Sequence, residues 1–527
     1  MSEVAISVLV EASVKGEYQI PEFQREFRWA PRQVAAFVDS LSSGFPVGCL
    51  VVWPQVSKEG KAAVYVVDGQ QRITALCVMF GKRPDWKDDK DWQAVSALYG
   101  QYLNVSSDGD FSFGRKRGGW VSLPISEILT KTSKEEVTNL VSKTLDDTKI
   151  EREQARTTLY EKAKQVWNIR LNVLPVVDIT SQNPLDVAEM YNRLNLMGTK
   201  IRETDTQLAY IAVRNPGWVK GVFRVFLKDL ESSTNERWSL LPEHILRCMT
   251  ILYEETPRVG SLKEEEKFWE SGCKDSFEKV KNAIKDIIPR LRRYGVYSVD
   301  DVPQPYTLIA LFSFHARFSK EKNYDFGAVF RWFLSANVIG RYAGAPLQHL
   351  TEDAGKFMKS ANPSEALEAL FFEMPKDEIA RALEEELPKP FKKNSPGALL
   401  LKVLLWDKAI DWRKGGKLSD YPPLEWHHII PSKVIKSMVA DESVANNISN
   451  MTPLSAEANK EFKDKPPWIY APNFIQDPTR LESHFIPKSY AKAFIAGKVI
   501  SDTGELGKFF VERLKVIRKE AKQLLGL

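Results

Sequence analysis

The chain has 527 residues, more than the roughly 250–300 at which a single hydrophobic core stops growing, so we expect two or three domains. Hydrophobic residues make up 43% and charged residues 27%, which is typical of a soluble globular protein. Four widely spaced cysteines argue against a disulfide framework or a cysteine zinc site. The first residues lack the basic segment of a signal peptide, and no apolar run approaches the about 18–20 residues of a membrane span. We therefore expect a cytoplasmic protein without a membrane part.

Basic charge is concentrated in the last quarter of the chain. Residues 388–527 contain 23 Lys and Arg against 15 Asp and Glu, a surplus of +8, whereas the rest of the chain carries −3. Such a surplus is expected of a domain that binds phosphate groups, and a solvated basic surface is the other interpretation.

The first 205 residues alternate between helix and strand patterns, which predicts one α/β domain. Pro31 stands at the favoured first position of a helix, and glycines are placed to end two of the helices. The predicted elements are, in chain order, a helix from Pro31 to Gly44, strands at 47–53 and 63–67, a helix that ends at Gly81, a helix at 150–170, a strand at 171–179 and a helix at 183–198.

A polar turn, Asp68-Gly69-Gln70-Gln71-Arg72, follows the second strand and leads into a helix. Gly69 allows a sharp turn and the close approach of a ligand, and a helix N-terminus offers free N–H groups to a phosphate. Arg72 has the planar fork that binds phosphate oxygens, and Asp68 suits a magnesium ion or a water. The turn therefore predicts a nucleotide site, with a simple polar helix cap as the alternative interpretation.

Residues 206–387 show amphipathic helix patterns rich in Trp and Phe, without strand signals, which predicts a helical middle region. The stretch 384–398 mixes Pro, Gly and charge, and we interpret it as a linker. The remaining residues, 388–527, form the last expected domain and finish with an amphipathic helix. We assign the apolar stripe of this helix to packing; its members are Leu506, Phe509, Phe510, Leu514, Ile517 and Ala521.

Two adjacent histidines, His427 and His428, lie in the segment L-E-W-H-H-I-I-P. Side chains alternate between the two faces of a strand, so both histidines serve one site only if the strand twists or enters a loop. An isolated pair usually has no function. Here, however, it is followed by N-x-x-x-L at Asn450 and by Asn459-Lys460, nine residues after Asn450, which favours a functional site.

Three motifs in the N-terminal part resemble the ParB/sulfiredoxin-like N-terminal domain of GmrSD-type restriction enzymes. They are I-P-x-x-Q-R-x-x-x-W at 20–29, D-G-Q-Q-R-x-T at 68–74 and Y-x-R-L-N-x-x-G-T at 191–199. In that family the domain binds and hydrolyses nucleoside triphosphate, so the resemblance implies a nucleoside triphosphatase that takes GTP, UTP, CTP or ATP. It places the nucleotide at Asp68, Gly69, Gln70, Gln71 and Arg72, with Arg25 and Asn195 nearby.

The histidine cluster looks like an HNH (ββα-metal) nuclease, of the kind that forms the C-terminal half of GmrSD-like proteins. The resemblance implies that His427 and Asn459 bind one Mg²⁺ or Mn²⁺ ion, which stabilises the departing 3′-oxygen. His428 would take a proton from the attacking water, since imidazole changes its charge near neutral pH. This chain has His427 where many members have Asp, and it lacks the four cysteines that hold zinc in many HNH domains, so we expect no structural zinc.

Asn450 would brace the loop and orient the general base, although Asn446 and Asn447 compete for this central role. The lysines that follow could hold the DNA backbone; they are Lys460, Lys463 and Lys465.

Together these patterns predict an α+β multidomain protein: a ParB/sulfiredoxin-like α/β domain, a helical middle region, and an HNH nuclease domain within a mainly helical C-terminal part. The expected function is an NTP-regulated endonuclease that nicks or cuts modified or phage double-stranded DNA, as a type IV restriction enzyme or an SspE- or BrxU-like protein does. Two alternatives stay open: a ParB-like nucleotide-dependent DNA switch with an inactive nuclease, and an HNH ribonuclease toxin. The helical middle region offers a surface for a homodimer.

Overall fold

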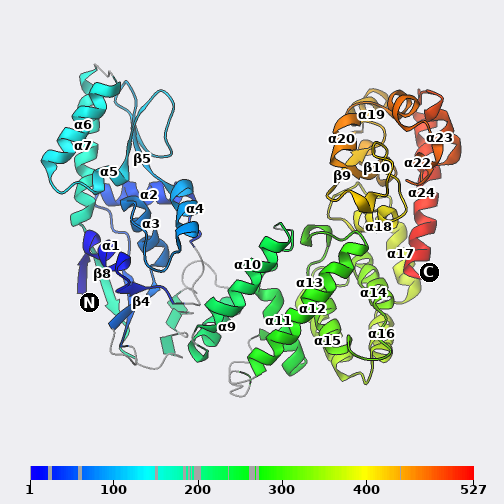
Figure 1. Ribbon diagram of the computed structural model, residues 1–527, viewed down its shortest axis with the longest axis horizontal. Helices are drawn as coiled ribbons and strands as arrows, with labels where there is room; N and C mark the ends of the chain where they lie inside the picture. Colours follow the sequence, from blue (N-terminus) through cyan, green and yellow to red (C-terminus); the bar gives the residue numbers. More distant parts are fainter. Residues whose placement is uncertain are drawn as a thin grey trace. The chain divides into compact units, whose positions relative to one another are not determined.

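The computed structural model describes residues 2–21, 27–56, 62–148, 152–181, 203–215, 217–235, 237–259, 272–439 and 441–527, together with 186–187, 190–191, 193–194 and 268. The chain divides into two compact units, Met1–Lys220 and Gly221–Leu527. The molecule is α+β, with a small mixed sheet in its N-terminal part and a mainly helical C-terminal part (Figure 1).

The first unit is built on a mixed sheet in the order β1-β8-β3-β4-β2. β1 runs antiparallel to β8 and β3 antiparallel to β4, whereas β8 and β3 are parallel, as are β4 and β2. Valine dominates β3, β4 and β8, and its branched side chain suits a buried pleated surface. The strands are β1 (Ser2–Ala5), β2 (Tyr18–Gln19), β3 (Leu50–Val56), β4 (Ala62–Asp68) and β8 (Val173–Asp178).

Helices pack on this sheet around one hydrophobic core. α3 is buried from Ile73 to Phe80 and contacts α1 and α5. It ends at Gly81, whose φ of 64° lies in the left-handed region that glycine adopts without strain. The helices of this unit are α1 (Ile6–Val14), α2 (Pro31–Ser42), α3 (Gln70–Phe80), α4 (Asp89–Tyr99), α5 (Ile125–Leu129), α6 (Lys134–Thr148), α7 (Glu153–Asn168) and α9 (Glu203–Arg214).

A second, antiparallel sheet in this unit has the order β6-β5-β7 and was not predicted from the sequence. Its strands are β5 (Tyr102–Val105), β6 (Phe111–Gly114) and β7 (Val121–Pro124). By contrast, the predicted helix from Pro31, the strands before Asp68, the helix that ends at Gly81, and the elements at 150–170 and 171–179 are confirmed. Most of the predicted helix at 183–198 lies outside the described residues.

The second unit begins with the helical region predicted for the middle of the chain. Neighbouring helices pack on one another, and α13 contacts α11, α12 and α15. The helices are α10 (Arg224–Ser233), α11 (Pro242–Glu254), α12 (Cys273–Arg293), α13 (Tyr306–Phe318), α14 (Phe326–Ile339), α15 (Pro346–Lys359), α16 (Pro363–Phe372), α17 (Lys376–Glu386) and α18 (Pro396–Trp406).

The C-terminal part of this unit contains a two-stranded sheet among short helices (Figure 1). The long last helix, α24, packs against α14, α17 and α18, so the C-terminal part and the helical region share one compact unit. The elements are β9 (Leu424–His428), α19 (Ser432–Met438), β10 (Met451–Ser455), α20 (Ala456–Phe462), α21 (Pro467–Tyr470), α22 (Pro478–Glu482), α23 (Lys488–Ile495) and α24 (Thr503–Leu525), with short 3₁₀ turns at Glu442–Asn446 and Ile448–Asn450.

The stretch 384–398, which the sequence suggests as a linker or boundary, lies inside the second unit, where it joins α17 to α18 and makes contacts of its own. Pro390 forms a β-bridge with Asn447, and the Phe391 amide donates to the Asn446 carbonyl at 2.6 Å. Ser395 then caps α18 by accepting a hydrogen bond from the Ala398 amide. Proline and charge in this stretch therefore mark an extended segment that crosses the nuclease-like motif.

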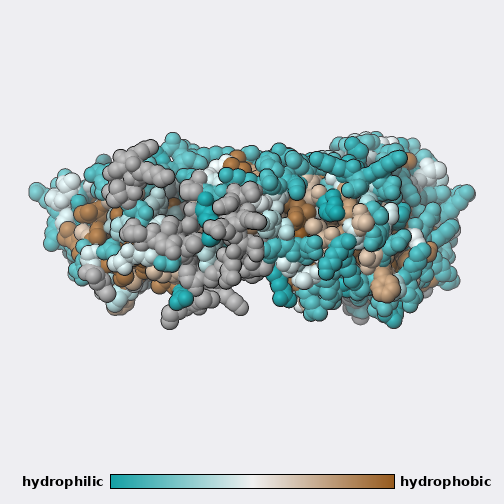
Figure 2. All heavy atoms as spheres, turned by 90° about the horizontal axis from the view of Figure 1, so that it is seen from below, coloured by the Kyte–Doolittle hydropathy of each residue, from teal (hydrophilic) through white to brown (hydrophobic). Residues whose placement is uncertain are grey.

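None of the helices in the described part of the chain is both long enough and apolar enough to cross a membrane. The face of the second unit that is visible in Figure 2 is mostly hydrophilic.

Candidate active site

The polar turn at 68–72 stands where β4 ends and α3 begins. Gly69 has φ +100°, and a Cβ at this position would lie 2.3 Å from Cδ2 of Leu50, so both the backbone angle and the packing require glycine. The turn therefore brings together Asp68, the last residue of β4, and Arg72, in the first turn of α3.

Arg72 is held inside the protein. Its Nη2 donates to Oδ2 of Asp68 at 2.7 Å, and its Nη1 donates to the Val47 carbonyl at 3.2 Å. Gly48 leaves room for this guanidinium, because a Cβ there would lie 2.4 Å from Nη1. A phosphate ligand would thus have to share or replace the contact with Asp68, which makes this ion pair the group that a nucleotide would rearrange.

Gln71 joins the turn to the end of the first motif. Its Oε1 accepts hydrogen bonds from the backbone amides of Arg28 at 2.7 Å and Trp29 at 3.2 Å. A cavity of about 440 Å³ adjoins Arg72, and its lining residues are Trp29, Gln33, Ala36, Phe37, Ser40, Pro46, Val47 and Arg72. Two residues that the sequence places at the nucleotide, Arg25 and Asn195, lie outside the described residues. Gln70 is the first residue of α3.

The histidine pair ends β9, which runs antiparallel to β10 with His428 opposite Met451 and His427 opposite Thr452. Ser455 ends β10 and caps α20 by accepting a hydrogen bond from the Ala458 amide. This strand–strand–helix arrangement carries Asn459, on α20, back to His427 on β9.

His427 and Asn459 face each other, with 2.9 Å between Nδ1 and Oδ1. This distance is also about that expected between neighbouring ligands of an octahedral ion bound at about 2.1 Å. Glu425 lies two residues before His427 on the same face of β9, and its Oε2 accepts from Nδ2 of Asn459 at 2.7 Å. The imidazole of His427 therefore lies at the oxygen of this amide and the carboxylate of Glu425 at its nitrogen. An imidazole nitrogen and an amide oxygen are donors that a divalent cation accepts, although no three His, Cys, Asp or Glu side chains of the described residues are grouped to hold a metal ion.

Burial lowers the pKa of His427 to about 4, because desolvation penalises its charged form. In the absence of a cation, the amide oxygen of Asn459 accepts from Nδ1, so Nε2 is a buried acceptor for which no described residue provides a donor. The ring packs perpendicular to Trp412, at 5.8 Å between centroids. A neutral imidazole that can move its proton to Nε2 is the form in which Nδ1 is able to bind a metal.

His428 is partly exposed, and its Nε2 lies 3.1 Å from Oδ1 of Asn446. An amide oxygen only accepts, so Nε2 carries the proton and Nδ1 is an acceptor that no described residue occupies. Asn446 is fixed by its own carbonyl, which accepts from the Phe391 amide. The structure thus presents Nδ1 of His428 as the atom that is able to take a proton.

Asn450 is completely buried and bridges the loop that follows His428. Its Oδ1 accepts from the Ile430 amide, and its Nδ2 donates to the carbonyls of Ile430 and Ala445, each at 2.9 Å. Asn447 has a local role instead, since it caps the turn at Ile448–Asn450. The three asparagines therefore have different contacts: Asn450 braces the loop, Asn446 contacts His428, and Asn447 caps the turn.

Arg513 is a buried cation that the sequence did not indicate as part of this region. It lies on α24, is 0% exposed, and donates to four carbonyls, those of Ile448, Ser449, Met451 and His484. Three of these carbonyls surround Asn450 in the chain. Arg513 is thus the group that ties the last helix to the asparagine loop.

His484 is a second buried histidine next to this site. Its Nε2 donates to the Ile410 carbonyl at 2.9 Å, and its Nδ1 accepts from the Thr452 hydroxyl at 2.6 Å. Desolvation lowers its pKa to about 3, so it is neutral in the folded protein at ordinary pH.

Acid should destabilise the protein through His484. The folded pKa lies below the ordinary value of 6.5, so the unfolded chain binds a proton that the folded chain does not, and stability falls as the pH decreases below 6.5. Between pH 6.5 and pH 5 this residue alone should lower the free energy of unfolding by about 2 kcal/mol. Urea unfolding at several pH values measures how the free energy of unfolding changes with pH. His484→Gln should flatten that slope, and an equal slope in both proteins would contradict the assignment.

Two of the predicted DNA-binding lysines, Lys460 and Lys463, are exposed and have no described carboxylate within ion-pair distance. Lys465 is instead paired with Glu461 at 3.2 Å. Sequence reasoning missed Glu425 as a member of the site, although its position two residues before His427 on a strand was a usable signal.

Comparison with known proteins supports the N-terminal motifs. Residues 6–212 match the family model for the N-terminal domain of the GmrSD restriction endonuclease. The chain is also 21% identical over 520 residues to the uncharacterized protein MJ0686 of Methanocaldococcus jannaschii, an alignment that covers 89% of this chain and 86% of that protein. The N-terminal part of the chain is thus similar to the N-terminal domain of GmrSD restriction endonucleases.

Proposed function

We propose that the protein is an NTP-regulated, metal-dependent HNH endonuclease that nicks or cuts modified or phage double-stranded DNA. The observation that carries this proposal is the β9–β10–α20 arrangement, which brings His427 and Glu425 into contact with Asn459, while His428 follows His427 on β9 and contacts Asn446. The similarity of residues 6–212 to the N-terminal domain of the GmrSD restriction endonuclease supports DNA as the substrate.

In the proposed reaction each residue has one task. Nδ1 of His428 takes a proton from the attacking water, while Nε2 keeps its hydrogen bond to Asn446 and so holds the ring in orientation. Asn450 keeps the loop after His428 in place. His427 and Asn459 would hold one Mg²⁺ or Mn²⁺ ion, with Glu425 orienting the Asn459 amide; when bound, the ion supplies positive charge to the scissile phosphate and the departing oxygen.

Nucleotide control is assigned to the turn at Asp68–Arg72. The guanidinium of Arg72 already donates a hydrogen bond to the carboxylate of Asp68, so a bound triphosphate would compete with Asp68 for it. Because Gln71 holds the amides of Arg28 and Trp29, a shift of this turn would move the adjoining segment as well. We propose that this segment transmits the nucleotide state within the first unit, and that two chains act together as a homodimer when both strands are cut.

A plasmid assay tests the proposal. Supercoiled DNA that is unmodified, hydroxymethylated, glucosylated or phosphorothioated is incubated with Mg²⁺, Mn²⁺ or EDTA, with and without GTP, UTP, CTP or ATP. Cleavage should need the metal ion and should change with nucleotide, and Arg72→Ala should remove the response to nucleotide whereas the exposed control Lys90→Ala should keep it.

Other outcomes would replace the proposal. Triphosphate hydrolysis without cleavage of any DNA would favour a nucleotide-dependent DNA switch. Degradation of total RNA in a parallel tube, with plasmid left intact, would favour a ribonuclease.

A further inference from the structure

The turn between β6 and β7 carries three consecutive cations, Arg115, Lys116 and Arg117, and all three are exposed. No described carboxylate lies within ion-pair distance of Arg115, Lys116 or Arg117. Glycines flank the run on both sides, and a Cβ at Gly114, Gly118 or Gly119 would meet nothing within 4 Å, so the turn projects into open space. Like charges this close repel one another, so the charge of this run opposes folding rather than favouring it, although the Arg117 side chain donates to the Ser112 hydroxyl at 3.3 Å.

The turn is ordered by a buried amide. Asn104, on β5, is 1% exposed; its Nδ2 donates to the Arg115 carbonyl at 3.1 Å, and its Oδ1 accepts from the Arg117 amide at 3.3 Å. The Ser122 hydroxyl also donates to Oδ1, at 2.6 Å. Burying an amide is costly unless it is hydrogen-bonded, and here those bonds fix the backbone on both sides of Lys116.

Aromatic rings accompany the cations. The guanidinium of Arg117 lies 4.3 Å from the Trp120 ring centroid, and the ammonium of Lys162 lies 4.0 Å from that of Phe111, a ring that is 38% exposed. These contacts are of the cation–π kind and keep the cations along the sheet edge. Cations interleaved with aromatic rings are the combination that binds phosphates and stacks on bases.

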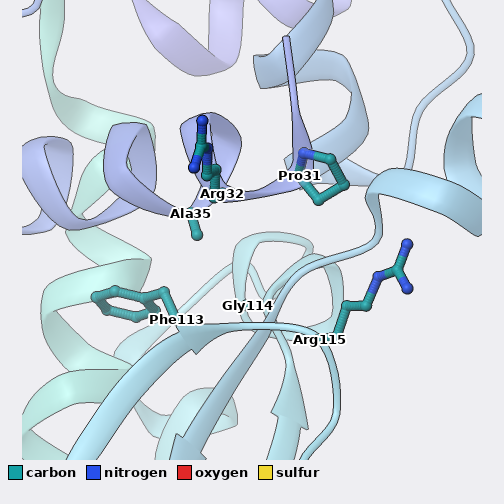
Figure 3. Close-up of a pocket in the computed structure, with 6 residues that line it drawn as sticks. All are labelled: Pro31, Arg32, Ala35, Phe113, Gly114 and Arg115. Carbon is teal, nitrogen blue, oxygen red and sulfur yellow. The ribbon is translucent and has the colours of Figure 1, made fainter. Parts of the chain in front are cut away.

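A cavity of about 460 Å³ adjoins the turn, between α2 and β6. Its lining residues are Pro31, Arg32, Ala35, Phe113, Gly114 and Arg115. In Figure 3, Ala35 points toward β6 and Arg115 extends toward Pro31, whereas Arg32 points away from β6. The hollow is thus lined by apolar groups together with two arginines, Arg32 and Arg115, a combination that suits a sugar–phosphate unit.

We infer that this turn and its adjoining hollow form a DNA-binding surface in the first unit, made of other residues than the turn at Asp68–Arg72. Arg115, Lys116 and Arg117 contact successive phosphates, and Phe113 borders the hollow that receives one sugar. The choice of DNA rather than another polyanion rests on the proposed function.

The test uses the full chain with His428→Ala, so that binding is measured without cleavage. Fluorescence anisotropy of a labelled DNA duplex is recorded between 50 and 200 mM NaCl. Removing three phosphate contacts with Arg115→Ala/Lys116→Ala/Arg117→Ala should weaken binding about 10-fold or more and lower the slope of log K against log salt by about 2–3. Lys116→Ala alone leaves the Arg117–Trp120 contact intact and should lower the slope by about 1.

The matched control removes three exposed lysines of the same unit, Lys90, Lys143 and Lys164, and should change the affinity less than about 2-fold. Equal affinity and equal salt slope in the triple variant and its parent would overturn the inference. So would loss of poly-glutamate binding with DNA binding retained, which would assign the turn to an acidic protein. If the turn binds DNA but the parent protein with His428 cuts no DNA, the inferred DNA-binding surface is supported and the proposed nuclease activity is contradicted.

Discussion

Replacing His428 with alanine should lower the rate of metal-dependent plasmid cleavage by about 10²- to 10⁴-fold, because the attacking water loses the base that takes its proton. No described residue occupies Nδ1 of His428, and the contact with Asn446 fixes its ring. The rate is measured as loss of supercoiled plasmid under single-turnover conditions, in which product release does not limit the result.

The control for this substitution is His349→Ala. His349 lies on α15 of the same unit, where its Nδ1 is 3.2 Å from Oε2 of Glu352, so its loss should leave the rate within about 2-fold. Asn446→Ala should lower the cleavage rate less than His428→Ala does, because the base is still present although its ring is no longer held in place by Asn446. Cleavage by the His428→Ala protein at the parent rate would exclude this residue as the base.

Replacing Arg513 with methionine should lower the free energy of unfolding of the second unit by about 3–5 kcal/mol. Methionine has a similar length but no donors, so the carbonyls of Ser449, Met451 and His484 would lose their hydrogen bonds from Arg513, whereas the Ile448 carbonyl would keep the one from the Met451 amide. Part of this loss is offset, because burial of the cation is itself unfavourable, as shown by a pKa lowered to about 9 by desolvation.

Two comparisons separate the buried contacts from the charge. Lys515→Met removes one positive charge from an exposed position on the same helix and should change stability by less than about 0.5 kcal/mol. Arg513→Lys keeps the charge but cannot reach all four carbonyls. The decrease in its free energy of unfolding should therefore lie between the decreases caused by Arg513→Met and by Lys515→Met. Urea unfolding measures all three proteins. A loss with Arg513→Met no larger than with Lys515→Met would contradict the role assigned to this residue.

Local patterns were sufficient for several elements of the first unit. Pro31 and Gly81 mark the limits of two helices because their backbone preferences act within a single turn, whatever packs around them. The sheet of β5, β6 and β7 was missed, since each strand has only four residues and is specified by pairing with the others rather than by its own pattern.

The last helix shows where periodicity alone misleads. The predicted stripe includes Leu514, but the structure buries Arg513 between Phe509 and Ile517 instead. Arg513 has the right helical spacing for the buried face, yet a cation there is acceptable only because four carbonyls from distant segments converge on it. No pattern within the helix contains that information.

The sequence by itself determined the residue types and spacings of the two motifs, because Asp68–Arg72 and His427–Asn459 each lie within a short stretch of chain. The tertiary structure decided which side chains meet. It paired Arg72 with Asp68, gave Asn446 rather than Asn450 the contact with His428, and added Glu425 to His427 and Asn459. The physical reason is that motifs record local chemistry, whereas hydrogen-bond partners depend on how strands and helices from different parts of the chain pack together.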